Sequence, residues 1–385
     1  CNLCQIDFNR ASTHTSKPKK VRQIMSKKYL GLALAISAAS AAQAGNVTTS
    51  GEDLVIDTDS GIKVKVSDNS ASFQLGGRIQ WDYDATQSDD NGVDTTDFDV
   101  RRARLYAKGH FGDWAYKTQF NVAESDGADG GTAEDLYIRY LGFGSTATVT
   151  IGKQKEPFGL EQLTSSKDIS ALERSAMTER YTPGRSGGIQ LSGKGDNWTY
   201  GIGYFEADGN GSDDFNNTAV TARGTVAPIQ TNNMVVHLGA GYTTRDADTQ
   251  ADEVDTFNLE LAGAFGPFHA QAEYFDSEEG QVDVDGYYVQ LGWIITGESR
   301  PYKAGAFKRV KPASPKGAWE VVARFEDGDG KYSDVGLATT DGEQTTLGVN
   351  YYANKNVRLG MSYMDGEEAN GASGDEVRAR LQYAF

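Results

Sequence analysis

Cysteine is almost absent from this chain of 385 residues. The only two, Cys1 and Cys4, stand at its start, so a small domain held together by disulfides is excluded. Their C-x-x-C spacing would suit a redox or zinc pair, but no second cysteine pair or histidine cluster lies nearby to complete one. The fold must therefore rest on packing and hydrogen bonding.

Proline and long apolar runs are also scarce. The chain has 8 prolines against 45 glycines, together with 19 tyrosines, 16 phenylalanines and 5 tryptophans, a composition that favours many strands and tight turns. Its mean hydropathy is negative, which excludes a helical membrane protein. It does not exclude a transmembrane barrel, whose strands expose only half of their side chains to lipid.

Basic residues are outnumbered, with 37 Lys and Arg against 54 Asp and Glu. Without residues 1–44 the counts are 30 and 53, a net charge of −23. So acidic a protein is not expected to bind nucleic acid.

The segment from Met25, "MSKKYLGLALAISAASAAQAGN", has the three parts of a secretory signal peptide. Two lysines precede an apolar run that is shorter than the roughly 20 residues of a membrane-spanning helix, and a small-x-small cleavage site follows. We therefore predict a signal peptide over 25–44 and a mature chain that begins at Gly45. Residues 1–24 precede the first methionine and are interpreted as a non-native upstream extension.

After a short segment at 45–70, predicted to be periplasmic, one module of about ten residues recurs through 71–385. It alternates polar and apolar residues, as expected of a strand with one wet and one dry face. Sixteen copies are found, near 71–84, 97–111, 113–124, 133–142, 146–153, 186–194, 196–206, 217–227, 233–245, 254–265, 267–276, 284–295, 318–326, 343–352, 356–365 and 376–385. An even number of strands is typical of a bacterial barrel.

Short connections such as "FGD" and "KGD" alternate with longer Asp- and Gly-rich ones, which is the pattern of periplasmic turns and outer loops. Aromatic residues gather at the strand ends, as in a membrane girdle. These features predict an all-β fold, a 16-stranded antiparallel transmembrane β-barrel in the outer membrane of a Gram-negative bacterium, in contact with outer-membrane lipid and lipopolysaccharide. A soluble sandwich or propeller would also alternate, but would not combine a secretion signal with so polar an opposite face.

The block "RRARLYAKGHF" from Arg101 concentrates cations on one strand face. Alternation assigns a set of basic residues to the lumen, on six strands that barrel closure makes neighbours: Arg78, Arg102, Arg104, Lys108, Lys117, Arg139, Arg358, Arg378 and Arg380. We interpret them as one basic wall that guides anions, because arginine keeps its charge and offers several donors. The alternative is that they merely pair with carboxylates such as Asp82 and Asp135. The opposite strands contribute Glu260, Glu273, Glu320 and Glu326.

The connection "GKQKEPFGLEQLTSSKDISALERSAMTERYTPGRSGG" from Gly152 is too long for a turn and carries apolar residues that need burial. We predict that this third loop folds into the barrel and narrows it, with a short helical turn over 166–174.

Several stretches together resemble the phosphate-selective porins of Gram-negative outer membranes. They are "RRARLYAKGHFGDWAYKTQF", "AEDLYIRYLG", "GKQKEPFGLEQLTSS", "ALERS" and "GAWEVVARFEDGD". The resemblance implies a homotrimer of barrels, an inward third loop, an arginine ladder that leads anions to a lysine-lined constriction, and a periplasmic connection that enters the lumen, for which 296–316 is the candidate.

The constriction candidates in the third loop are Lys153, Lys155, Lys167 and Arg174. Between Lys153 and Arg185 the loop has six cations and five anions, so anion selectivity is predicted more firmly than phosphate selectivity. Small inorganic anions, phosphate or related oxyanions, are the expected solutes of this passive channel. The alternative is a general, structural or adhesive barrel without oxyanion specificity.

No catalytic residue, metal site or cofactor is predicted. A barrel hydrolase would need a Ser/His pair backed by an acid or amide, and none of the histidines at 110, 237 and 269 stands in a nucleophile motif. Acidic loops such as "DGDGKYSD" could bind Ca²⁺ but lack the twelve-residue EF-hand spacing.

Overall fold

The computed structural model describes residues 45–49, 52–58, 61–88, 94–123, 131–207, 217–246, 253–332, 335 and 339–385. All of them belong to one compact unit, 43–385. The predicted upstream extension and the signal peptide up to residue 44 lie outside the described residues. Among the described residues, no helix is long and apolar enough to cross a membrane.

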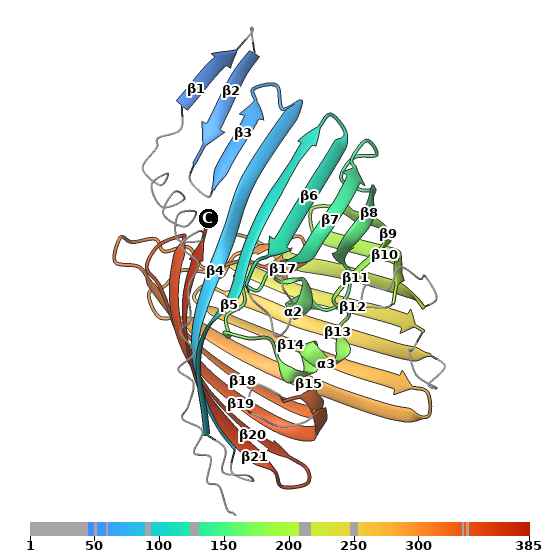
Figure 1. The fold of residues 1–385 in the computed structure, drawn as a ribbon, viewed down its shortest axis with the longest axis vertical. Helices are drawn as coiled ribbons and strands as arrows, with labels where there is room; N and C mark the ends of the chain where they lie inside the picture. The colour runs from blue at the N-terminus through green and yellow to red at the C-terminus, as the bar shows by residue number, and fades with distance from the viewer. Residues whose placement is uncertain are drawn as a thin grey trace, which may run out of the picture. The chain divides into compact units, whose positions relative to one another are not determined.

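A closed ring of sixteen antiparallel strands dominates the fold (Figure 1). The strands are β4 (Ala71–Ser88), β5 (Asp94–Phe111), β6 (Trp114–Asn121), β7 (Thr132–Tyr140), β8 (Thr148–Lys155), β9 (Arg185–Lys194), β10 (Trp198–Glu206), β11 (Thr218–Gln230), β12 (Met234–Arg245), β13 (Val254–Phe265), β14 (Phe268–Glu279), β15 (Val282–Ile294), β18 (Ala318–Lys331), β19 (Thr339–Tyr352), β20 (Val357–Glu368) and β21 (Ser373–Ala384). Each pairs with the next, and β21 pairs with β4 to close the barrel. All sixteen predicted strands are confirmed, most with ends shifted by a few residues.

Three short strands precede the ring: β1 (Gly45–Thr49), β2 (Glu52–Asp57) and β3 (Ile62–Val66). They pair with one another in order, and β3 pairs with the first residues of β4, Ser72 to Leu75. β21 takes over the same edge of β4 from Arg78 onward. The predicted periplasmic segment is therefore a β-extension of the barrel sheet.

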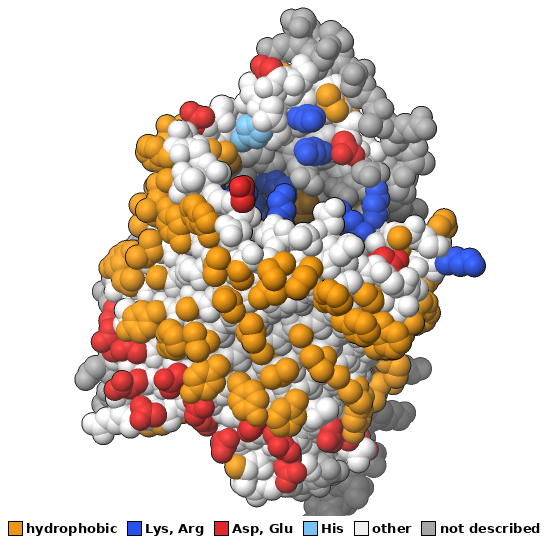
Figure 2. All heavy atoms as spheres, turned by 180° about the vertical axis from the view of Figure 1, so that it is seen from behind, with side chains coloured by type: hydrophobic (Ala, Val, Ile, Leu, Met, Phe, Trp, Pro, Cys, Tyr) orange, Lys and Arg blue, Asp and Glu red, His pale blue; other side chains and the backbone are white. Residues whose placement is uncertain are grey.

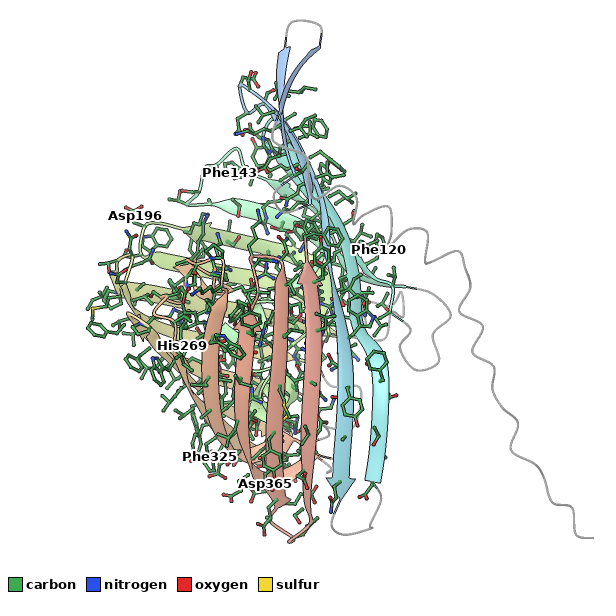
Figure 3. All side chains as sticks on the ribbon, turned by 90° about the vertical axis from the view of Figure 1, so that its left-hand side faces the viewer. Phe120, Phe143, Asp196, His269, Phe325 and Asp365 are labelled. Carbon is green, nitrogen blue, oxygen red and sulfur yellow. The ribbon has the colours of Figure 1, made fainter. Side chains whose placement is uncertain are left out.

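The strands bury one face and expose the other. On β13, for example, Asn258 and Glu260 are buried, whereas Leu259 and Leu261 are about half exposed. Outward-facing side chains such as Phe120 and Phe325 can be followed in Figure 3, and Figure 2 shows an apolar band across the visible face of the outer surface. This is the alternation that lipid on one side and a polar interior on the other require.

Aromatic pairs mark the barrel end that carries the short turns. They are Trp114 with Tyr140, Trp198 with Tyr200, Phe268 with Trp293, and Trp319 with Tyr351. Their ring centroids lie 4.7–6.0 Å apart, within the range of favourable aromatic contact. They form the interfacial girdle at this rim.

The β8–β9 connection, residues 156–184, contains the helices α2 (Leu160–Leu163) and α3 (Ala176–Tyr181). Its apolar side chains are buried: Phe158, Leu160 and Met177 have no exposed surface. The predicted helical turn over 166–174 is wrong, since turns and bends occupy this stretch between the two helices. Arginine side chains from the barrel donate to three carbonyl groups of this stretch, which a continued helix would need for its own hydrogen bonds.

The β15–β18 connection, residues 295–317, also makes buried contacts. It contains the two-residue strands β16 (Tyr302–Lys303) and β17 (Ala306–Phe307), which pair with each other. Phe307 packs in a cluster with Leu160 of the β8–β9 connection. The two connections therefore meet each other inside this unit.

Candidate functional site

The strand register assembles the predicted basic wall. Arg78 of β4 stands opposite Arg104 of β5, and Lys108 of β5 stands opposite Lys117 of β6. Residues directly opposite each other in an antiparallel pair share one face of the sheet. The structure therefore brings these four cations together on one side of neighbouring strands.

Other members of the wall are occupied by the β8–β9 connection. Arg358 of β20 donates to the carbonyls of Ile169 and Ser170, at 2.7 Å each. Arg380 of β21 donates to the carbonyl of Leu172 and forms an ion pair with Asp82. These arginines are buried and hold the connection in place.

Arg102 and Arg378 are occupied too. Arg102 binds Glu173 of the connection through both terminal nitrogens, at 2.8 and 2.7 Å. Arg378 pairs with Asp84 and with Glu376. The alternative reading, in which wall arginines pair with carboxylates, thus describes this part of the wall.

Two adjacent acids of β7, Glu134 and Asp135, pair with cations of neighbouring strands. Glu134 pairs with Arg104, and Asp135 accepts from Lys117 at 2.5 Å. Arg185, at the start of β9, bridges both acids at 2.7 and 2.9 Å. Arg185 was not among the predicted wall residues, because alternation does not reveal how the end of a strand bends.

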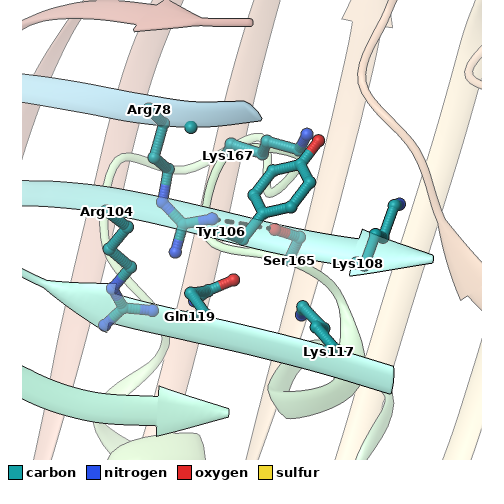
Figure 4. A pocket seen from close by; sticks show the side chains of 9 residues that line it. Arg78, Arg104, Tyr106, Lys108, Lys117, Gln119, Ser165 and Lys167 are labelled. Atoms are coloured by element: carbon teal, nitrogen blue, oxygen red, sulfur yellow. Dashed lines mark hydrogen bonds between the residues drawn. The ribbon is translucent and has the colours of Figure 1, made fainter. Parts of the chain in front are cut away.

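One group of cations surrounds an open cavity of about 130 Å³, shown in Figure 4. We call it the basic pocket; it is lined by Gly77, Arg78, Arg104, Tyr106, Lys108, Lys117, Gln119, Ser165 and Lys167. A cavity of this size holds several waters or one small oxyanion. β4, β5 and β6 supply most of its wall, and the β8–β9 connection supplies the rest.

Three cations of the basic pocket form no ion pair with a carboxylate within the part of the chain that the structure describes. Arg78, which is 7% exposed, donates to Ser165 Oγ at 3.2 Å, and its buried Nε has no partner. Lys108 lies over the ring of Tyr106, 5.2 Å from its centroid, and Lys167 completes the set. A buried guanidinium donor without a partner, with two lysines beside the same cavity, is an arrangement expected where an anion binds.

Lys167 titrates near neutral pH. Burial is the main cause; the charge of Asp168 raises the pKa, those of Arg309, Arg78 and Lys108 lower it, and the resulting pKa of Lys167 is about 8. Its ammonium group is therefore charged at pH 7 and neutral at pH 9.

The other predicted constriction residues have different surroundings. Lys155 Nζ donates to the carbonyl of Gln162, and Arg174 donates to the carbonyls of Glu161 and Thr164 at 3.3 and 3.2 Å. Lys155 ties the connection to the end of β8, and Arg174 ties the connection to itself. Lys153 stands opposite the exposed Leu136 in the β7–β8 register, so it lies on the outward face and does not join the cluster.

Arg139 of β7 is half-buried and stands apart from the basic pocket. It donates to Thr150 Oγ1 at 2.8 Å and lies 5.1 Å from the ring centroid of Tyr137. It has hydrogen-bonding capacity left on the lumen face.

Carboxylates on the strands that face the basic wall hold the β8–β9 connection in place. Glu273 accepts from the backbone N–H groups of Leu160 and Glu161, at 2.7 and 2.9 Å, and Glu326 accepts from that of Ala176 at 2.6 Å. These N–H groups lie at or beside the first turns of α2 and α3, where a helix has free donors. The connection is thus held by carboxylates on one side of the barrel and by arginines on the other.

The segment 295–317 is anchored by histidines whose role alternation did not reveal. His237 is bonded to Glu260 at 2.9 Å and to Tyr302 at 2.6 Å. His269 is bonded to Glu320 at 2.8 Å, and its other ring nitrogen lies 3.3 Å from Arg300 Nη1. The sequence signal for this role was a histidine at a strand position that alternation assigns to the inner face.

Known proteins that resemble the chain identify its family. The model of the family "Phosphate-selective porin O and P" matches residues 73–258 and 249–385. The chain belongs to this family. Porin O of Pseudomonas aeruginosa is 31% identical to it, over 93% of this chain and 98% of that protein. An uncharacterized protein of Caulobacter vibrioides is 26% identical, over 66% of this chain and 59% of that protein.

Solved structures agree on the fold. An anion-selective porin from Comamonas acidovorans superposes with a TM-score of 0.58 and 15% identity, covering 82% of this chain and all of that one. OmpF of Salmonella typhi gives the same TM-score at 14% identity, covering 83% of this chain. The protein is therefore a porin of the Gram-negative outer membrane that forms a passive anion channel, as the sequence predicted.

Membership in a porin family indicates a channel rather than an enzyme. Within the described residues, no group of His, Cys, Asp and Glu side chains is placed to hold a metal ion.

Proposed function

We propose that the basic pocket is the selective point of the channel and that its preferred solute is a phosphate-like oxyanion. The observation that carries this proposal is the set of three pocket cations, Arg78, Lys108 and Lys167, that form no ion pair with a carboxylate among the described residues. The family description, "Phosphate-selective porin O and P", points to the same class of solute.

The pocket offers the two kinds of donor that an oxyanion needs. Arg78 and Arg104 supply fixed planar donors, and the lysines supply mobile point charges. Ser165 and Gln119 add neutral donors that can replace the water an anion loses on entering.

Release is as important as binding in a passive channel. Glu134 and Asp135 pair with Arg104 and Lys117, two of the cations that line the pocket. These carboxylates moderate the positive potential, so a bound anion is not trapped. We infer that Arg139 and the engaged arginines of β20 and β21 shape the approach to the pocket, whereas Lys155 and Arg174 set the position of the connection.

We also propose that the porin works as a homotrimer in contact with lipopolysaccharide. The OmpT porin of Vibrio cholerae, solved in a trimer form, superposes with a TM-score of 0.52. Separation of the unheated protein on a native gel, before and after cross-linking, tests the trimer: a species that remains monomeric would rule it out.

Single-channel recording in a planar bilayer tests the proposed solute. Chloride current through the wild-type porin should fall as phosphate is added, because a bound phosphate excludes chloride from the pocket. Lys108→Gln should raise the half-blocking phosphate concentration. Lys316→Gln, which removes an exposed lysine outside the pocket, is the matched control.

Wild-type current that phosphate does not reduce would refute oxyanion specificity. Such a result would favour the alternative of a general or structural barrel.

A further inference from the structure

Glu173 of the β8–β9 connection is surrounded by arginines. Arg102 holds both carboxylate oxygens, Arg380 binds one of them, and Arg101 Nε lies 3.3 Å away. The nearest nitrogen of Arg378 is 3.8 Å from the same carboxylate. The side chain of Glu173 is only 4% exposed.

This is the geometry with which proteins bind free oxyanions. A two-pronged guanidinium contact, reinforced by further arginines, is a strong and selective carboxylate or phosphate site. Burial raises the pKa of Glu173, but Arg102, Arg380 and Arg101 more than offset this and hold it well below its ordinary value. The carboxylate is therefore ionised and occupies the position of a bound anion.

We name the group formed by four residues the arginine cage: Arg101, Arg102, Arg378 and Arg380. Carboxylates on the strands neutralise part of the cage, since Asp82 pairs with Arg380 and Asp84 pairs with Arg378. The hydrogen bonds of the Arg102 guanidinium go to Glu173 and to the neutral Gln80. Removing Glu173 would leave the Arg102 donors without their carboxylate while the rest of the cage stays in place.

We propose that the arginine cage is a second oxyanion site of the porin and that Glu173 is a tethered carboxylate that fills it. The site takes small carboxylates and tetrahedral oxyanions once Glu173 is removed. The role of the arginine cage in transport rests on the proposed function. While Glu173 is in place, a passing oxyanion binds at the basic pocket, and the cage holds the connection in position.

Chemical rescue tests the site itself. Purified Glu173→Ala porin should unfold at a lower temperature than the wild type, and acetate should raise its unfolding midpoint in a concentration-dependent way, because a ligand that binds only the folded state stabilises it. Titrations are made against KCl at equal ionic strength. Glu179→Ala is the matched control, since Glu179 lies on the same connection but is 46% exposed and 3.7 Å from its arginine.

A transport readout separates an anion site from a purely structural role. Glu173→Gln keeps the shape of the side chain and removes its charge, leaving the cage with an unbalanced cation. The half-blocking phosphate concentration should fall by roughly tenfold, the effect of about one additional charge-assisted hydrogen bond. Glu179→Gln should leave it unchanged.

Acetate that stabilises Glu173→Ala no more than Glu179→Ala would overturn the proposal, as would an unchanged phosphate block in Glu173→Gln. If Glu173→Ala does not fold in KCl, acetate present during refolding should restore the barrel, and failure to do so counts against the site. A wild-type channel that phosphate does not block would refute the proposed function alone, because the acetate rescue does not depend on transport.

Discussion

The pH dependence of anion block offers a direct test of the basic pocket. The pKa of Lys167 is lowered to about 8, chiefly by burial, so raising the pH from 7 to 9 converts its ammonium group into a neutral amine. A lysine with a lowered pKa is charged below that pKa and loses its charge above it. Anion affinity should therefore be high at pH 7 and fall through pH 8.

The size of the effect follows from Coulomb's law. At an effective dielectric of about 20, a unit charge about 4 Å away contributes about 4 kcal/mol, and about half of that at twice the distance. Water in an open cavity and salt at 0.1 M, with a Debye length of about 10 Å, reduce this further. A remaining difference of about 1.4 kcal/mol corresponds to a tenfold change in affinity.

Sulfate is the suitable probe, because its charge stays constant over this range whereas that of phosphate does not. The half-blocking sulfate concentration is measured on chloride current from pH 6.5 to 9.5. Wild type should show a step of roughly tenfold centred near pH 8, and Lys167→Met should show weak block without the step. Lys316→Met is the control. A step that persists in Lys167→Met would assign the titration to another group and refute this account of the pocket.

Three further predictions concern the assembly of the lumen. Deleting residues 155–182 should raise single-channel conductance and weaken ion selectivity together, measured as unit current and reversal potential; unchanged conductance would mean that the connection does not narrow the pore. Deleting Phe385 should slow folding into lipid vesicles, because its N–H and carbonyl both bond to Gly77 of β4 at 2.9 Å; equal folding rates would contradict this. Arg300→Ala removes the contact to His269 and should destabilise the barrel by about 2 kcal/mol and increase current noise; unaltered stability and noise would argue that segment 295–317 is held in another way.

The architecture could be predicted from sequence because it depends on a local rule. Alternation of polar and apolar residues follows from lipid on one face and a polar interior on the other, and it acts on each strand separately. Hence Leu259 and Glu260 fall on opposite faces as expected. Closure between β21 and β4 then follows from the even strand count.

The partners of the lumen residues could not be predicted in the same way. Alternation gave the face of Arg358, but its carbonyl partners are 188 and 189 residues away along the chain. Likewise Lys155 and Arg174 were expected at the constriction because of their charge, whereas their hydrogen bonds go to backbone carbonyls of the β8–β9 connection. Irregular segments carry no periodic signal that fixes such contacts.

Identical residues on one wall therefore have different consequences for an ion. Arg102 and Arg78 both lie on the lumen face, yet one is matched by Glu173 and the other only by the hydroxyl group of Ser165. A matched guanidinium presents little net charge to solution, while an unmatched one presents nearly all of it, so on the proposed function selectivity depends on which cations lack an acid. The difference between matched and unmatched cations explains how a strongly acidic chain can favour anions. Its other carboxylates lie elsewhere or hold the two connections in place, and on the proposed function the potential in the pathway is set by the few cations that form no ion pair with them.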